Sequence, residues 1–213
     1  MLGRIRWGSG RKIVLVAERI LELPVLLLEL PRFARRPERA VRKGSDLLVK
    51  HGVKYVLVPP DFSWWFILTG VGLRPVDTIP LRRALVPAWT AAQLNRRGIA
   101  PEQAILRLKG ERWEPVLEEL AWDLCPMVRR LIFDVPGGEE MANRLRREKG
   151  IPVLPGNFTN AHLTLRLDDG PILAGAEITL PGWELPVDCD ILSMLSVLWE
   201  TGRVKIEEIV LKL

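Results

Sequence analysis

The sequence predicts a single α/β domain: three layers, with a mostly parallel sheet, helices on both of its faces, and an antiparallel edge or hairpin in the C-terminal part. The clearest observation is the order strand, turn, helix, strand. Leu131–Val135 is a short apolar run, Pro136-Gly137-Gly138 is a turn, Glu139–Lys149 is a helix with acids first and bases last, and a second apolar run starts at Ile151. Short links between such elements indicate a parallel, right-handed crossover of the Rossmann-like kind.

Two further observations support this fold class. Three predicted helices end in basic residues and a glycine and lead directly into an apolar strand, with glycines at 52, 98 and 150. The chain of 213 residues is long enough for one full core, and no Ser/Gly-rich linker divides it. We therefore expect one domain over 1–213, with 1–12 as a loose basic lead-in and 157–213 as a more strand-rich extension.

The first elements of the chain are predicted from short apolar runs and prolines. Lys12–Ala17 favours a strand, although the same run could begin a helix through Leu23. Val25–Leu30 is Leu-rich and follows Pro24, which favours a helix with the proline in its first turn. Pro37 is well placed to begin a helix that ends at Gly52.

Five elements are expected between that helix and the strand at Leu131. They are a strand over Val53–Val58, a short helix over Trp64–Leu68 capped by Asp61 or Ser63, and a helix over Leu81–Arg97 with a kink or break at Pro87. A strand over Ala104–Leu108 and a helix over Pro115–Leu124 follow. After Gly156 the pattern changes. Leu163–Leu167 and Ile172–Leu180 flank Asp168-Asp169-Gly170 and predict a hairpin on the sheet edge or a small antiparallel extension. A helix over Ile191–Trp199 and a strand over Val204–Leu213 complete the chain.

Composition restricts the class of protein. About half of the residues are apolar and about a quarter are charged, which argues against disorder. Two cysteines outside any CxxC pair favour a reduced, cytoplasmic protein. The most apolar stretch, Ile13–Leu30, is interrupted by four charges and a proline, so no transmembrane segment is expected.

The turn at Gly137-Gly138 is the best candidate for a ligand-binding site. In parallel sheets, ligands bind beyond the carboxyl ends of the strands, and glycines allow a phosphate to approach the helix amides. We therefore predict that Asp134, Gly137, Gly138, Asn157 and His162 bind a ligand. A simple tight turn is the alternative, because the full GxGxxG pattern is missing and Glu139 and Glu140 would repel a phosphate. No metal site is assigned, since Asp168-Asp169-Gly170 fits a turn and Asp188 or Asp190 fits a helix cap.

Two other stretches suggest partners. Trp64–Phe66 could stack on a flat ligand, although buried anchors or a contact between two copies explain these aromatics equally well. Residues 1–54 hold 13 Lys and Arg against 5 Asp and Glu, and the densest basic run is Arg32–Lys43. This run permits nucleic acid or a membrane surface as a partner, but no recognised module accompanies it, so a solvated helix face is the simpler interpretation.

The sequence alone identifies neither a reaction nor a cofactor. We expect a non-catalytic binding or interaction protein that self-associates through the aromatic residues Trp64–Phe66 and the Leu-rich N-terminal part. The alternative is a binder or enzyme for a nucleotide or phosphometabolite, with its site at the Gly137-Gly138 turn. Whether the protein is an enzyme stays open, because neither cysteine has a catalytic signature and the carboxylates form no evident pair.

Overall fold

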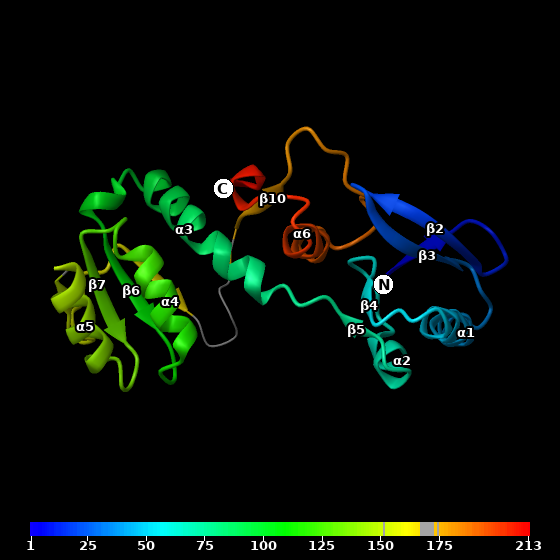
Figure 1. Ribbon diagram of the computed structural model, residues 1–213, viewed down its shortest axis with the longest axis horizontal. Coiled ribbons are helices and arrows are strands. Elements are labelled where there is room, and N and C mark those ends of the chain that lie inside the picture. The colour runs from blue at the N-terminus through cyan, green and yellow to red at the C-terminus, as the bar shows by residue number, and fades with distance from the viewer. Residues whose placement is uncertain (151, 167–172, 174) are drawn as a thin grey trace. The chain divides into compact units, whose positions relative to one another are not determined.

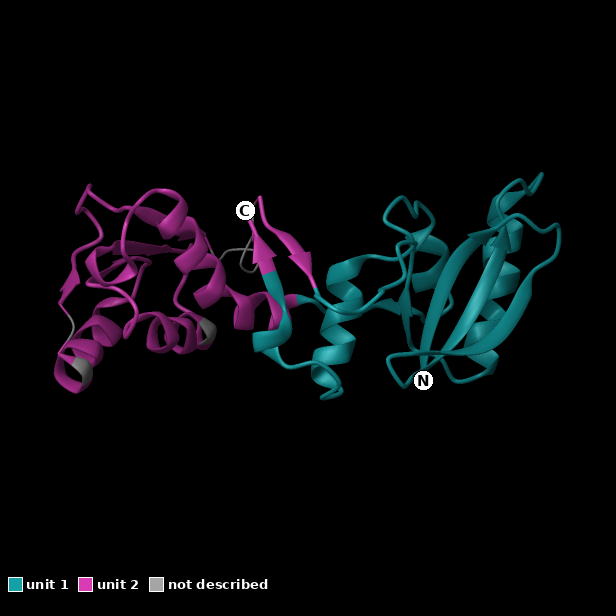
Figure 2. Cartoon of the chain, turned by 90° about the horizontal axis from the view of Figure 1, so that it is seen from above, with its two compact units in different colours: residues 1–78, 180–210 teal, residues 79–179, 211–213 magenta. Residues whose placement is uncertain are grey.

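The computed structural model describes residues 1–150, 152–166, 173 and 175–213 (Figure 1). Its contacts divide the chain into two compact units, coloured in Figure 2. Unit 1 contains residues 1–78 and 180–210, and unit 2 contains residues 79–179 and 211–213. Unit 1 is therefore discontinuous in sequence, because the chain leaves it after residue 78 and returns to it at residue 180.

Unit 1 is built on a five-stranded sheet in the order β2-β3-β1-β4-β5. Its strands are β1 (Leu2–Gly8), β2 (Val14–Ile20), β3 (Leu23–Pro31), β4 (Tyr55–Leu57) and β5 (Arg74–Pro75). β1 pairs in parallel with both β3 and β4, and only β2 is antiparallel to its neighbour. The expected loose lead-in at residues 1–12 is therefore wrong, because β1 is the central strand of this sheet.

The predicted helix at Val25–Leu30 is also wrong, since these residues belong to β3. Val25 to Leu28 and Leu30 are all buried, so the strand is apolar on both faces, as interior strands of mainly parallel sheets are. The turn between β2 and β3 consists of Leu21 and Glu22, with φ angles of 47° and 62°. Two positive φ angles match a tight hairpin turn that usually contains Asn or Gly, and this explains why the sequence did not indicate a hairpin.

Helices complete unit 1. α1 (Pro37–Lys50) places Val41 and Leu48 against the face of the sheet that carries Ile5 and Leu28, and α2 (Trp65–Gly70) adds Ile67 and Leu68 to the same core. Gly44 allows α1 to approach closely, because a Cβ there would lie 2.8 Å from a Leu28 methyl group. α6 (Ile191–Glu200) and the short 3₁₀ helix Ile206–Glu208 lie in the returning segment.

Unit 2 contains an all-parallel sheet in the order β8-β7-β6-β9. Its strands are β6 (Ile105–Lys109), β7 (Arg130–Asp134), β8 (Val153–Leu154) and β9 (Leu163–Arg166). The helices are α3 (Ile79–Arg96), α4 (Pro115–Leu124) and α5 (Glu139–Lys149), with a 3₁₀ turn at Pro101–Gln103. One core cluster joins Leu94 of α3, Leu124 of α4 and Leu145 of α5 to alternate residues of the strands. The predicted units β6-α4-β7 and β7-α5-β8 are confirmed, and Gly150 ends α5 with a φ of 67°.

The α/β class is confirmed, with helix-flanked, mostly parallel sheets and a small antiparallel pair in the C-terminal part. The parallel strands are divided between two sheets. The described residues of Leu163–Leu167 and Ile172–Leu180 do not form the predicted hairpin, because β9 pairs in parallel with β6. The alternative, a small antiparallel extension, is present instead, since β10 (Glu177–Thr179) pairs with β11 (Val210–Lys212). The turn predicted at Asp168-Asp169-Gly170 lies outside the described residues. None of the described helices combines the length and the apolar character needed to cross a bilayer.

Candidate functional site

A cavity of about 400 Å³ opens at the carboxyl ends of β7 and β8, within unit 2. Its volume lies in the range of pockets that bind small organic molecules. The turn after β7, the exposed side of α5 and the loop after β8 form its walls, and the lining residues are Phe133, Val135, Pro136, Gly137, Gly138, Glu139, Ala142, Asn143, Arg146, Leu154, Pro155 and Gly156. Gly137 and Gly138, both predicted to bind a ligand, are among them.

The backbone geometry of the turn explains why glycine occupies positions 137 and 138. Gly137 has a φ of 80°, which residues with a side chain rarely adopt. Gly138 is the N-cap of α5 and donates its amide hydrogen to Val135 O over 3.1 Å, and a Cβ there would lie 3.2 Å from the same oxygen and 3.3 Å from Phe133 Cβ. Gly156 is still tighter, because its Cβ would come within 2.9 Å of Phe133 O. The glycines thus let the two loops approach β7 closely and leave the cavity open above it.

The polar groups of the cavity come from one side of α5. Glu139, Asn143 and Arg146 are spaced so that they share one face of the helix. Arg146 donates from Nη1 to Asn143 Oδ1 over 2.8 Å and from Nη2 to Val153 O over 2.7 Å. These bonds hold the guanidinium between α5 and β8, where its remaining N–H groups are available to an acceptor.

Asp134, also predicted as a site residue, is engaged by the protein itself. Its Oδ2 accepts a hydrogen bond from Arg107 Nη1 over 3.2 Å and lies 3.8 Å from Lys109 Nζ. Arg107 also donates from Nη2 to Phe158 O. Asp134 therefore links the ends of β6 and β7, and through Arg107 it positions the loop that follows the cavity.

The structure does not bring the other two predicted residues into the cavity. Asn157 follows Gly156 and is exposed, but it is not among the lining residues. His162 precedes β9 at the amino end of the sheet, where its Nδ1 accepts the Ile105 amide hydrogen over 2.9 Å and its carbonyl accepts a bond from Arg97. Because β6 runs about 13 Å from Ile105 to its carboxyl end, His162 and Gly137 lie at opposite edges of the sheet.

Sequence reasoning did not single out Asn143 and Arg146, the two polar side chains of α5 that face the cavity with Glu139. A signal was present, since positions 139, 143 and 146 repeat with helical spacing directly after the glycine turn. Leu154 and Pro155, which form the opposite wall, were assigned only to a strand and a loop.

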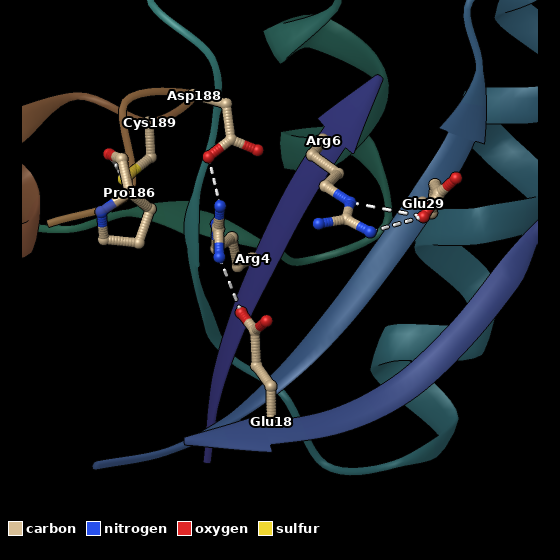
Figure 3. A network of polar contacts seen from close by, with 7 residues as sticks. All are labelled: Arg4, Arg6, Glu18, Glu29, Pro186, Asp188 and Cys189. Carbon is tan, nitrogen blue, oxygen red and sulfur yellow. Dashed lines mark hydrogen bonds and ion pairs between the residues drawn. The ribbon is translucent and has the colours of Figure 1, made fainter. Parts of the chain in front are cut away.

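A second polar cluster lies on sheet β2-β3-β1-β4-β5 of unit 1 (Figure 3). Arg4 is only 6% exposed, and it donates to Glu18 Oε1 over 2.9 Å and to Asp188 Oδ1. Burial opposes its charge, but the hydrogen bonds and charges of Glu18 and Asp188 outweigh burial and hold the pKa of Arg4 above its usual value. Arg6 forms a separate pair with Glu29, with Nη2 and Oε2 2.8 Å apart. Since Asp188 comes from the returning segment, Arg4 joins the two sequence-distant parts of unit 1.

The environment of Cys189 disfavours a thiolate. Both Cys125 and Cys189 are buried. Burial raises the pKa of the Cys189 thiol to about 11, and the carboxylates of Asp188, Asp190 and Glu18 add to this, although Arg4 opposes it. The acids considered for metal binding have other contacts: Asp188 pairs with Arg4, and Asp190 caps α6 by accepting the Ser193 amide hydrogen over 2.8 Å. Within the described residues, no cluster of three His, Cys, Asp or Glu side chains could hold a metal ion.

The aromatic residues after β4 are mainly part of a packed cluster. Trp64 and Trp65 contact Phe62 edge to face, and Trp7 from β1 stacks on Phe62 with ring centroids 5.9 Å apart. Phe66 differs, because 64% of it is exposed. Most of this cluster thus stabilises unit 1, and only its margin is available to a partner.

Comparison of the sequence with protein-family models gave no match, and the comparison with curated proteins likewise found none.

Proposed function

We propose that the protein is a non-catalytic binding protein whose unit 2 holds a small organic molecule in the cavity beside Gly137 and Gly138. The observation that carries this proposal is the cavity of about 400 Å³ at the carboxyl ends of two parallel strands. This is the position at which α/β sheets bind ligands, and the adjoining glycines give a ligand access to backbone amides.

The lining restricts the class of ligand. Phe133, Val135 and Leu154 supply apolar surface, while Asn143 and Arg146 supply hydrogen-bond donors. Glu139 places a carboxylate at the start of the same helix, so the two charged side chains of the lining balance each other. We infer a ligand with an apolar or planar body and at most one negative charge, because a polyphosphate would be repelled by Glu139 and opposed by a single arginine.

A thermal-shift screen of the full chain with neutral and monoanionic metabolites tests the proposal. A ligand at 100 times its Kd stabilises the folded state by about 2.7 kcal/mol, which corresponds to roughly 10–20 °C in the melting temperature of a unit of about 100 residues. Hits are then measured by isothermal titration calorimetry on Asn143→Leu and Arg146→Leu variants, which change polar groups of the lining without the close contacts of Gly138.

Arg147→Gln is the matched control, because Arg147 is an exposed arginine on the same helix that is absent from the cavity lining. The proposal predicts at least tenfold weaker binding for Asn143→Leu and Arg146→Leu and unchanged binding for Arg147→Gln. A ligand that binds all three variants equally binds elsewhere, and a screen without any stabilising compound argues against the cavity as a site.

Self-association is a second candidate, supported by the edge of the sheet in unit 1. β2 is the terminal strand of that sheet, seven residues long, and Val14 and Val16 on it are 42% and 48% exposed. A long apolar edge can pair with the same edge of a second copy. Mass measurement by light scattering should then show a dimer that Val16→Lys dissociates. A monomer at all accessible concentrations argues against this candidate.

We also propose that the protein is cytoplasmic, because both cysteines are buried and neither forms a disulfide, which agrees with a reducing compartment. Retention of the native fold in the presence of a strong reductant supports this, whereas a disulfide in the purified protein would oppose it.

A further inference from the structure

We propose that unit 1 binds single-stranded nucleic acid through the segment between β3 and α1 and the small pocket beside it. This site is separate from the cavity in unit 2, so the two proposals can fail independently. The proposed site consists of the pocket formed by Trp7, Trp64, Asp61, Ser63 and Arg32, and of the basic run Arg32–Lys43.

The pocket has the size and the walls that one nucleobase requires. Its volume is about 180 Å³, which is too small for most drug-sized molecules but suits a single flat ring system. Two half-buried indole rings, those of Trp7 and Trp64, form its aromatic wall, with centroids 5.4 Å apart and planes at 73°. Aromatic walls of this kind bind bases by stacking regardless of sequence.

Polar groups at the same pocket match the edge and the backbone of a nucleotide. Asp61 supplies a carboxylate that accepts hydrogen bonds from exocyclic amino groups, and Ser63 supplies a hydroxyl. Arg32 is fixed next to β1, because its amide hydrogen is donated to Gly8 O over 3.0 Å. Arg32 also lines the pocket, so its guanidinium is available to a phosphate of the bound strand.

The basic run continues from the pocket along exposed backbone and the first two turns of α1. Phe33 lies inside this run and is 87% exposed, so an aromatic ring is interleaved with the charges. The exposed basic residues are Arg32, Arg35, Arg36, Arg39, Arg42 and Lys43. In the part of the chain that the structure describes, none of the six forms an ion pair.

The contrast with the rest of unit 1 favours an external anion as the partner of this run. Arg4 and Arg6 pair with carboxylates of their own sheet, and Arg19 pairs with Glu22 in the turn between β2 and β3. Six neighbouring cations without such a partner repel one another, and an anionic polymer that approaches them relieves this repulsion and releases counterions. A membrane surface would also supply anions, but a concave pocket with an aromatic wall fits an inserted base better than a lipid headgroup layer.

The test is the affinity of the full chain for a fluorescein-labelled single-stranded 20-mer of thymidine or uridine, measured by anisotropy from low to moderate salt. Arg35→Gln/Arg36→Gln removes two expected phosphate contacts, so the slope of log K against log salt should fall in magnitude by about 1.4. Phe33→Ala, a change at a fully exposed position, should weaken binding by about 5- to 150-fold if the ring stacks on a base. Trp64→Phe keeps the pocket aromatic and should weaken binding less.

The control removes the same charge elsewhere on the sheet. Lys54 and Arg74 are exposed at the amino ends of β4 and β5, whereas Arg32 lies at the carboxyl end of parallel strand β1. Lys54→Gln/Arg74→Gln should therefore bind like the unmodified chain. The proposal is overturned by any of four results: no binding at low salt, equal loss in this control, affinity for a mononucleotide equal to that for the strand, or binding to anionic phosphatidylserine vesicles without binding to the strand.

Discussion

Arg4 offers the sharpest test of how unit 1 is held together. Replacement of Arg4 by methionine keeps an unbranched side chain of similar length in a site that is 6% exposed, and it removes the partner of both Glu18 and Asp188. We expect this variant to lower the free energy of unfolding of unit 1 because the returning segment loses its link to β1.

The magnitude follows from the two bonds and their surroundings. Hydrogen bonds to charged groups contribute about 1.5–3 kcal/mol each, so their loss costs at most about 3–6 kcal/mol. Part of this is recovered, because the side chains of Glu18 and Asp188 are 23% and 36% exposed and regain water, and methionine avoids the burial of a charge. A net loss of about 2–3 kcal/mol is therefore expected.

Urea unfolding followed by far-UV circular dichroism and tryptophan fluorescence measures this loss. With a typical slope of about 1–3 kcal/mol per molar urea, the midpoint should fall by roughly 1 M. Arg19→Met is the matched control, because Arg19 and Glu22 form an ion pair with both side chains about three-quarters exposed, and such pairs contribute little. If Arg4→Met unfolds at the same urea concentration as Arg19→Met, or if Arg4→Met and Asp188→Asn show additive effects, the link is refuted.

Three further predictions concern local contacts. Gly156→Ala should destabilise unit 2 by about 1–3 kcal/mol, because its Cβ would lie 2.9 Å from Phe133 O. The control Gly10→Ala meets no atom within 4 Å and should be neutral. Urea unfolding of the two variants measures this difference in stability. Burial raises the pKa of Cys189 to about 11, so folding favours the protonated thiol. This contribution to stability is complete below the pKa of the unfolded state and is lost as the pH rises through 11. Cys189→Ala should therefore flatten the alkaline part of a plot of unfolding free energy against pH. Asp190→Ala should cost about 1 kcal/mol through loss of the α6 cap, and unchanged thermal unfolding would contradict this assignment.

The secondary structure was predicted best from the sequence where local signals and tertiary contacts agree. The segment from β6 to β8 combines short apolar strands, helices with acids first, and Gly150 in the left-handed conformation, so each element could be found without knowledge of its neighbours. The helix at Pro37 was found for the same reason, because proline favours the first turn of a helix.

The errors arose where distant residues decide the structure. β1 carries Arg4 in a buried position that only Glu18 and Asp188 make acceptable, and neither partner can be identified from the local sequence. β3 contains a run of leucines that suits a helix equally well, and its hairpin turn lacks glycine and asparagine; Arg203 donates to Leu21 O over 3.1 Å and supports that turn from far along the chain.

The candidate site was predicted in part. The Gly137-Gly138 turn could be located because a glycine pair after an apolar strand marks the carboxyl end of a parallel sheet. His162 was placed with it because the loop Gly156–His162 follows the next predicted strand in the sequence. Which end of the sheet a residue occupies depends on strand direction, however, and the parallel pairing of β9 with β6 places His162 at the amino end.

The most direct test of the central claim is a chemical-shift perturbation map of the full chain with the best compound from the metabolite screen. Binding in the cavity predicts that the largest amide shifts occur at Gly137, Gly138, Asn143 and Arg146, with small shifts at His162 on the opposite edge of the sheet. If the largest amide shifts lie away from the carboxyl ends of β7 and β8, the assignment of this cavity as the ligand site is contradicted.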